Sequence, residues 1–396
     1  MTSAKRWLLP DGVEEILPAE AHRLESLRRM ILDLYASWGY QLVITPLIEY
    51  LDSLLVGSSH DLDIHTFKIT DQLSGRMMGI RADITPQAAR IDAHCMNHEG
   101  PVRLCYADSV LHTRPRGILN SRVPIRIGAE LYGHVGVACD IELICLMVET
   151  LRRASIQDLH IVLGHVGIFR TLVHEAELAP DTERALFDAV QRKAYDEIDA
   201  VLDAQVADKN LERMLRELVR LSGSETVLEE AKRVFAQAPA SVQKELTDLI
   251  AISAGVESRL TDVVMNFDLC ELRGYEYHTG IVFAAYTPDY GRAVAKGGRY
   301  DHIGEVFGRK RPACGFDCDL KTLARLARRD FPQRQAIFAP SGAQAELLGT
   351  IDRLRDIGEI VIQDLGEEQP DAGLYQELNC DRRLVTKNGE WVVEEI

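Results

Sequence analysis

Charged and hydroxyl-bearing side chains stand inside segments of this sequence that otherwise have the composition of buried strands. In segment 81–86, an extended backbone places Asp83 and Thr85 on the same side of the chain. A carboxylate and a hydroxyl suit the ammonium group of a ligand, because both accept hydrogen bonds. A cap for a helix over 87–94 explains the same two residues at least as well.

Glu130 is a second carboxylate inside a strand-like run, 124–132. It has the same phase as Arg126 and Gly128, so one face carries two opposite charges beside a glycine that leaves room. A ligand-binding surface and an internal Arg126–Glu130 ion pair are equally good interpretations of this pattern.

The run 272–283 places Arg273, Tyr275, Tyr277 and His278 just ahead of a strand. An arginine beside several rings can bind a carboxylate and stack on a planar ligand. On the pattern alone, packing of the two tyrosines in the core or at a sheet edge is slightly the better interpretation.

Two adjacent glycines, Gly297 and Gly298, precede Arg299, Tyr300 and Asp301. The glycines permit a close approach of the backbone to a ligand, but a glycine pair by itself is a weak signal. Bracing of a turn by Arg299 and Asp301 explains the charges equally well.

The elements that must position these residues follow from hydrophobic periodicity. A helix is expected from Pro18 to Gly39, because its apolar residues recur at helical spacing and glycine is typical just past a helix end. Region 165–255, rich in Leu, Ala, Glu and Arg, predicts a helical insertion. The expected strands are 41–44, 103–106, 124–132, 263–267, 279–286 and 290–296, with a further helix over 140–153.

A change of pattern near residue 333 predicts a domain boundary. The tail reads as strand, helix, strand and then a hairpin with an Asn-Gly turn over 387–390. We therefore expect a core domain, 1–333, that contains the insertion 165–255, and a small acidic α/β tail domain, 334–396.

The composition excludes several classes of protein. With 45 Lys+Arg against 61 Asp+Glu, the net charge is −16, whereas affinity for nucleic acid comes largely from basic residues on phosphates. The longest apolar run, 141–150, is shorter than the ~20 residues of a membrane span. We expect a cytoplasmic protein with no nucleic-acid and no membrane partner.

Common cofactor motifs are missing from the sequence. It has no Walker A, Gly-x-Gly-x-x-Gly, Gly-x-Ser-x-Gly or His-Glu-x-x-His motif, and its eight cysteines lack zinc-finger spacing. We expect structural thiols, no metal site and no cofactor.

Taken in order, these segments resemble the catalytic core of the class II aminoacyl-tRNA synthetases, specifically the histidyl branch. The resemblance covers about residues 8–330 and implies an α+β fold, an antiparallel sheet flanked by helices. The segments that carry it are 81–85 (amino-acid loop), 128–130 (strand closing motif 2), 273–277 and 297–301 (two histidine-specific signatures) and 312–316 (start of motif 3).

The resemblance implies a pocket for free histidine. Asp83 and Thr85 would hold the ammonium group, Glu130 the imidazole N–H and Arg273 the carboxylate. Arg126 and His278 stand where the family usually has glutamine and tyrosine. The full expected set is Asp83, Thr85, Arg126, Glu130, Arg273, Tyr275, Tyr277, His278 and Tyr300.

The ATP-binding positions depart from the family. His112 and Thr322 stand where two arginines hold ATP, Arg114 replaces a glutamate, and Asp317 and Asp319 add negative charge. Loss of one preorganised donor costs about 10²–10³ in rate. We therefore expect negligible adenylation and no catalytic residues.

The tail departs from the family as well. Residues 336–396 contain 13 Asp+Glu and 5 Lys+Arg, so their net charge is 5 − 13 = −8, where the synthetases carry an anticodon-binding domain. A synthetase-like core without ATP clamps and with such a tail resembles the family of ATP phosphoribosyltransferase regulatory subunits, which are non-catalytic paralogues of histidyl-tRNA synthetase.

That resemblance implies an allosteric subunit of a glycosyltransferase complex. Its partners would be the short-form catalytic subunit and a second copy of itself, in a hetero-octamer with a dimer contact near 45–50. It would be required for activity and for histidine feedback at the first step of histidine biosynthesis. The alternatives are an active histidyl-tRNA synthetase with divergent motifs 2 and 3 and a free-standing amino-acid sensor.

Overall fold

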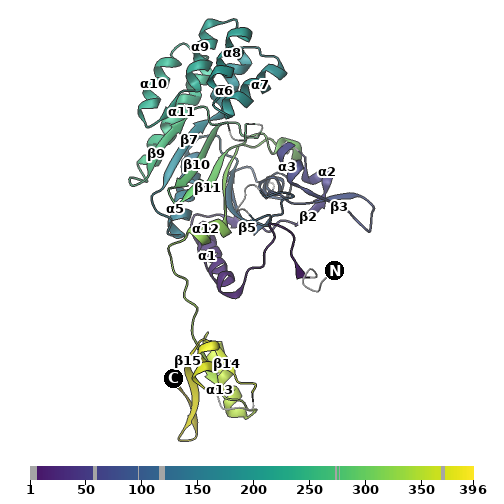
Figure 1. The fold of residues 1–396 in the computed structure, drawn as a ribbon, viewed down its shortest axis with the longest axis vertical. Helices are drawn as coiled ribbons and strands as arrows, with labels where there is room; N and C mark the ends of the chain where they lie inside the picture. Colours follow the sequence, from purple (N-terminus) through teal and green to yellow (C-terminus); the bar gives the residue numbers. More distant parts are fainter. Residues whose placement is uncertain are drawn as a thin grey trace. The chain divides into compact units, whose positions relative to one another are not determined.

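The structure is a computed structural model that describes residues 7–56, 60–96, 98–115, 121–272, 274–275, 277–366 and 371–396. The chain divides into two units, Met1–Arg329 and Asp330–Ile396. Each unit is built on a β-sheet of its own (Figure 1).

The main sheet of the first unit has nine strands within the described residues. Its six central strands, from β5 to β7, pair antiparallel with one another, whereas β1 pairs in parallel with β5 at one end and β9 in parallel with β7 near the other end, where β8 adds antiparallel to β9. In sheet order the strands are β1 (Gln41–Leu42), β5 (Val102–Ser109), β6 (Ile125–Tyr132), β12 (Ala313–Asp319), β11 (Tyr290–Arg299), β10 (Ile281–Thr287), β7 (His160–His165), β9 (Val264–Asp268) and β8 (Ser222–Gly223).

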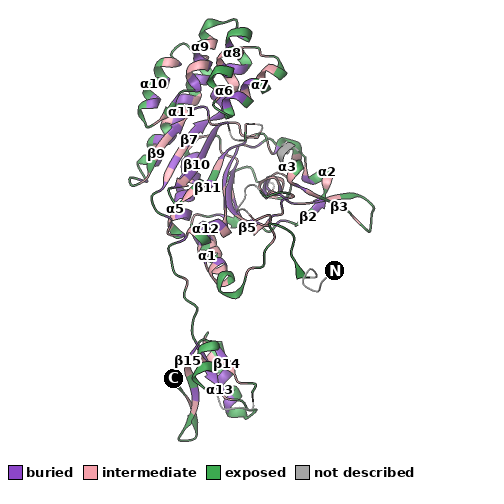
Figure 2. Ribbon diagram, viewed as in Figure 1, coloured by how far each residue is buried: buried purple, intermediate pink, exposed green. Residues whose placement is uncertain are grey.

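Helices cover one face of the main sheet, and the candidate functional site lies on the opposite face. The covering helices are α1 (Pro18–Ser37), α5 (Val137–Arg153) and α12 (Leu320–Leu326), which contact strands β5, β6, β10, β11 and β12. Figure 2 shows that burial is concentrated in the sheet. On the covered face, the ring of Phe316 lies edge-on to Tyr35 of α1, with centroids 6.1 Å apart. The predicted α+β class, with an antiparallel sheet flanked by helices, is confirmed.

A cluster of helices stands at one end of the sheet (Figure 1). It contains α6 (Val166–Glu175), α7 (Pro180–Gln191), α8 (Tyr195–Gln205), α9 (Lys209–Leu218), α10 (Thr226–Val234) and α11 (Ala240–Glu257). The short strand β8 interrupts the helices and pairs with β9, so the insertion is tied back to the edge of the main sheet.

A smaller sheet was not expected from the sequence. Its order is β2 (Ile48–Tyr50), β4 (Met77–Ile80) and β3 (Phe67–Thr70), and the short helices α2 (Leu51–Leu54) and α3 (His60–His65) lie between its strands along the chain. After β4 come α4 (Thr85–Arg90) and a π-helical segment, Ile91–Met96. Segment 81–86 thus runs from the end of β4 into α4, beside the main sheet.

The second unit is a four-stranded sheet with two helices in the described residues. The sheet order is β14 (Val361–Gln363), β13 (Ala336–Ala339), β15 (Cys380–Lys387) and β16 (Glu390–Glu395), with helices α13 (Ala345–Asp356) and α14 (Ala372–Glu377). The predicted hairpin turn is confirmed, with φ values of 53° at Asn388 and 85° at Gly389. Among the helices that the structure describes in either unit, none is long and apolar enough to cross a membrane.

Candidate functional site

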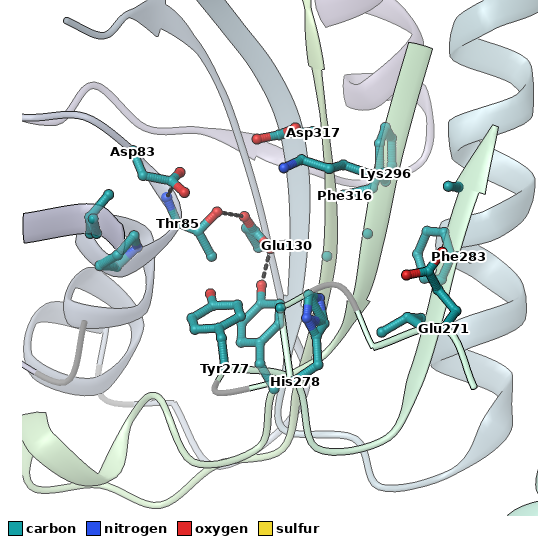
Figure 3. A pocket seen from close by; sticks show the side chains of 18 of the residues that line it. Asp83, Thr85, Glu130, Glu271, Tyr277, His278, Phe283, Lys296, Phe316 and Asp317 are labelled. Carbon is teal, nitrogen blue, oxygen red and sulfur yellow. Dashed lines mark hydrogen bonds between the residues drawn. The ribbon is translucent and has the colours of Figure 1, made fainter. Parts of the chain in front are cut away.

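A cavity of about 380 Å³ lies against the main sheet, and Figure 3 shows the side chains that line it. Strands β6, β10, β11 and β12 form its floor, and the segments before α4 and before β10 form its walls. Six of the nine predicted histidine-binding residues line it: Asp83, Thr85, Glu130, Tyr277, His278 and Tyr300.

Glu130 lies at the centre of the cavity floor and is fully buried. Its carboxylate accepts hydrogen bonds from Thr85 Oγ1 at 2.9 Å, from the hydroxyl of Tyr106 at 3.0 Å and from the hydroxyl of Tyr300. Burial raises the pKa of Glu130 to about 8, although the three hydroxyls oppose this shift. Gly315 makes room for it, because a Cβ at position 315 would lie 1.5 Å from Glu130 Oε2.

Asp83 lies on the wall of the cavity, just before helix α4, whose N-cap residue is Ile84. Asp83 Oδ1 accepts from the N–H of Ile84 at 2.6 Å and of Thr85 at 3.2 Å, and binding of an ammonium group by Asp83 stays a prediction. The adjacent Arg81 is buried and donates to the carbonyl and hydroxyl oxygens of Thr45, each at 2.7 Å. Arg81 therefore fixes the segment that carries Asp83.

Stacked rings close the cavity on the side of the 274–278 segment. Tyr277 stacks on Tyr300, with centroids 4.9 Å apart, and the His278 ring stands edge-on to Tyr277 at 5.3 Å. The His278 ring lies between Gly274 and Gly298. Both positions require glycine, because a Cβ would lie 2.7 Å from the ring at position 274 and 2.4 Å from it at position 298. Burial lowers the pKa of His278 to about 3, so this ring is neutral.

Two buried polar atoms at these rings have no hydrogen-bond partner among the described residues: the Tyr277 hydroxyl and His278 Nδ1. Burial of an unpaired polar group costs free energy, and such groups in native structures usually have a partner. Groups of a bound molecule can supply the missing partners.

Two predicted residues do not reach this cavity, and a third lies outside the described residues. Arg126 pairs with Asp317 at 3.4 Å, and it does so in place of the ion pair considered with Glu130. Tyr275 turns away and packs against two phenylalanines of the helical insertion. Arg273 is the residue that falls outside the described part of the chain.

Several cavity residues were not among the predicted histidine-binding residues, and one of them, Asp317, was noted only at the ATP-binding positions. Lys296 and Asp317 face each other across the β11–β12 pair, and both line the cavity (Figure 3). Lys296 alternates onto the same side of the chain as Gly298 and Tyr300. A charged residue on that side was a sequence signal by which Lys296 could have been predicted as a cavity residue. Glu271, Phe283 and Phe316 also line the cavity and carried no such signal, and the Phe316 ring itself packs against Tyr35 on the covered face.

A second cavity of about 490 Å³ adjoins the first and shares Lys296 and Asp317 with it. The positions where the synthetases bind ATP gather here. His112 is buried with Nε2 3.0 Å from a backbone oxygen, and Thr322 donates to Asp319 at 3.0 Å. Histidine, threonine and two aspartates thus stand at the positions where the synthetases bind ATP, and the basic residues of this cavity, Arg126, Arg292 and Lys296, lie at other positions.

Cys139, Asp140 and Cys314 form a buried group whose ligand atoms lie within 4.8 Å of one another. The guanidinium of Arg299 pairs with Asp140 at 2.9 Å and with Asp301 at 3.2 Å. This fixed positive charge opposes a metal ion, so the group forms an internal ion-pair cluster. The bracing role considered for Arg299 and Asp301 is confirmed.

Comparisons with known proteins identify the family and the fold. Residues 12–323 match the family model described as histidyl-tRNA synthetase. The fold is similar to the crystal structure of an ATP phosphoribosyltransferase regulatory subunit/histidyl-tRNA synthetase from Bacillus halodurans, with a TM-score of 0.82 and 24% identity over 96% of this chain and 98% of that one. Histidyl-tRNA synthetase from Nostoc sp. gives a TM-score of 0.76 at 19% identity over 98% and 97%. The fold and site thus define a class II, histidyl-tRNA synthetase-like protein.

The sequence relatives are more specific than the fold. Residues 334–394 match the model for the C-terminal domain of the ATP phosphoribosyltransferase subunit HisZ. An ATP phosphoribosyltransferase regulatory subunit from Alkalilimnicola ehrlichii is 53% identical over 98% of this chain and 96% of its own length. The subunit from Ectopseudomonas mendocina is 52% identical over 99% of both chains. This chain belongs to the family of ATP phosphoribosyltransferase regulatory subunits, as the sequence resemblance predicts.

Proposed function

We propose that this chain is the non-catalytic regulatory subunit of ATP phosphoribosyltransferase in histidine biosynthesis, and that its cavity binds free histidine as the allosteric signal. The observation that carries this proposal is the contrast between the two adjoining cavities. The first keeps a buried carboxylate, Glu130, among hydroxyl donors, whereas the second has Asp317 and Asp319 where a synthetase would bind ATP. An active synthetase is therefore not favoured.

Histidine fits the charges of the first cavity. Asp83 and Thr85 lie on one side of it and Lys296 on the other, with Glu130 between them (Figure 3). The ammonium group would bind Asp83 and Thr85, and the carboxylate would lie toward Lys296. A neutral imidazole has one donor and one acceptor, so it can pair with Glu130 and with the hydroxyl of Tyr277.

Self-association is supported by an exposed apolar strip at the smaller sheet and the segment before it. Ile44 is 79% exposed, Leu47 51%, Ile48 44% and Tyr50 37%. Large contiguous apolar surfaces usually mark interaction sites. We propose that this strip forms the contact between two copies, within a hetero-octamer that also contains the short-form catalytic subunit.

One assay separates this function from that of a synthetase. The purified chain is tested for ATP–pyrophosphate exchange with histidine, and then mixed with a short-form catalytic subunit whose transferase activity is followed with and without histidine. We expect no exchange, a change in transferase activity on mixing and a further change with histidine. Robust exchange would overturn the proposal, and an unchanged transferase would point to a free-standing sensor.

A further inference from the structure

The described residues before β10, at positions 274, 275, 277 and 278, face two sides: the cavity and the helical insertion. On the cavity side, Gly274, Tyr277 and His278 line the cavity. The backbone forms a tight turn, in which the N–H groups of Tyr277 and His278 both donate to the Gly274 carbonyl at 2.8 Å. Gly274 has φ of 71°, which glycine adopts without strain. The two hydrogen bonds hold Gly274, Tyr277 and His278 together in one turn.

The side that faces away from the cavity packs on the helical insertion. The ring of Tyr275 contacts Phe169 of α6 and Phe187 of α7, with centroid distances of 5.7 Å and 5.1 Å. Its hydroxyl donates to Glu183 of α7 at 3.0 Å. Tyr275 therefore joins the turn to two helices that contribute no residue to the cavity lining.

Arg170 of α6 holds the same turn at both ends. Its guanidinium lies over the Tyr275 ring, 4.7 Å from the centroid. Its Nη2 donates to the Tyr275 carbonyl and, at 2.9 Å, to the His278 carbonyl. The planar fork of arginine fixes such contacts in direction as well as in distance.

The surroundings of Arg170 leave room for movement. It lines a hollow of about 460 Å³ on the outside of the turn, together with His174, Glu177 and Glu183. A side chain beside open space can adopt a second arrangement without repacking a core.

We propose that Arg170 and Tyr275 are positioning residues that couple occupancy of the cavity to the stability of helices α6 and α7. This inference rests on the proposed binding of histidine. A ligand that pairs with Tyr277 and His278 would fix the turn, and the turn would fix Arg170 through the His278 carbonyl. Because coupling between two sites is reciprocal, loosening the helices must weaken binding in the cavity.

Hydrogen exchange on the full chain, with and without free histidine, tests the coupling. We expect histidine to slow exchange in peptides from 166–191 as well as from 274–280. In Arg170→Lys, which keeps the charge and loses the fork, the protection of 166–191 disappears and the affinity for histidine falls about tenfold, within the 5–150-fold range typical of such coupling. Tyr275→Phe keeps the ring contacts, loses the hydroxyl bond to Glu183 and gives a smaller effect in the same direction.

The matched control is Arg216→Ala in the same insertion, because Arg216 pairs with Asp199, Asp203 and Glu212 and does not contact the turn. It should keep both the affinity and the protection, even if its melting temperature falls as far as that of Arg170→Lys. If the unmodified chain binds histidine without protection of 166–191, the coupling is overturned and the cavity assignment stands. The same holds if the affinity for histidine is unchanged in both Arg170→Lys and Tyr275→Phe. A chain that binds no histidine would overturn the cavity assignment as well.

Discussion

Replacing Glu130 by glutamine removes the titratable group at the centre of the cavity and keeps its size. Burial raises the pKa of Glu130 to about 8, so the carboxyl is protonated in the empty cavity at neutral pH. The tyrosines around it do not titrate in this range, because burial raises the pKa of Tyr106, Tyr132, Tyr277 and Tyr300 above its usual value.

The pH dependence of histidine binding follows from these values. In the proposed complex, the imidazole and Glu130 share one proton, whichever of the two groups holds it. Free imidazole gains a proton below its pKa of about 6.5, and Glu130 of the empty cavity loses its proton above a pKa of about 8. Outside this window a proton must be released or taken up on binding, so the affinity falls about tenfold per pH unit on either side.

Isothermal titration of the full chain with histidine, from about pH 5.5 to 9, measures both limbs of this profile. We expect a maximum between the two pKa values for the unmodified chain. In Glu130→Gln the acidic limb remains, because the ligand must still lose a proton, whereas the fall that begins near pH 8 is removed. An identical alkaline limb in the two proteins would refute the assignment of this proton to Glu130.

Further substitutions test the cavity and the surface. Glu130→Ala should abolish measurable histidine binding in calorimetry, because a hydrogen bond to a charged group is worth about 1.5–3 kcal/mol; unchanged affinity would place the site elsewhere. Gly315→Ala adds a Cβ 1.5 Å from Glu130 Oε2, so we expect lower thermal stability and lost binding, and normal values of both would contradict the geometry. A further test compares denaturant unfolding of the unmodified chain and of Glu130→Gln without histidine. The free energy of unfolding of the unmodified chain should fall relative to that of Glu130→Gln as the pH rises from the ordinary glutamate pKa of 4.5 through about 8, because a buried carboxyl with a raised pKa stabilises the fold only while it is protonated. Ile48→Asp should yield monomers in sedimentation, whereas Leu73→Asp, at a position that is 98% exposed, should not; equal behaviour of the two variants would exclude the proposed strip.

Local signals in the sequence predicted the elements that depend on local chemistry. Helix α1 begins at Pro18 and is followed by Gly39 with φ of 83°, and the Asn388–Gly389 turn forms as expected. The sheet of β2, β4 and β3 was missed because its strands have three or four residues. Such strands are too short for a periodic pattern, and their pairing depends on partners distant in sequence.

The errors in the site have a similar origin. Arg126 and Glu130 share a strand face as predicted, but at about 3.3 Å per residue they lie roughly 13 Å apart. Arg126 therefore reaches the neighbouring cavity and pairs with Asp317. Tyr275 and Tyr277 lie in a turn, where the alternation of a strand does not hold, so only Tyr277 faces the cavity. The alternation along a strand predicts which face of the sheet a side chain occupies, but it does not predict where along that face the side chain lies.

The Tyr277 hydroxyl and His278 Nδ1 are buried and have no hydrogen-bond partner among the described residues. A ligand that pairs with them stabilises the native chain by RT ln(1 + [L]/Kd), which is about 2.7 kcal/mol at a hundredfold excess over Kd. That gain lowers the unfolded fraction about a hundredfold, and proteases act on the unfolded fraction. The abundance of histidine would then determine how long each copy of this subunit survives, in addition to how it behaves while it lasts.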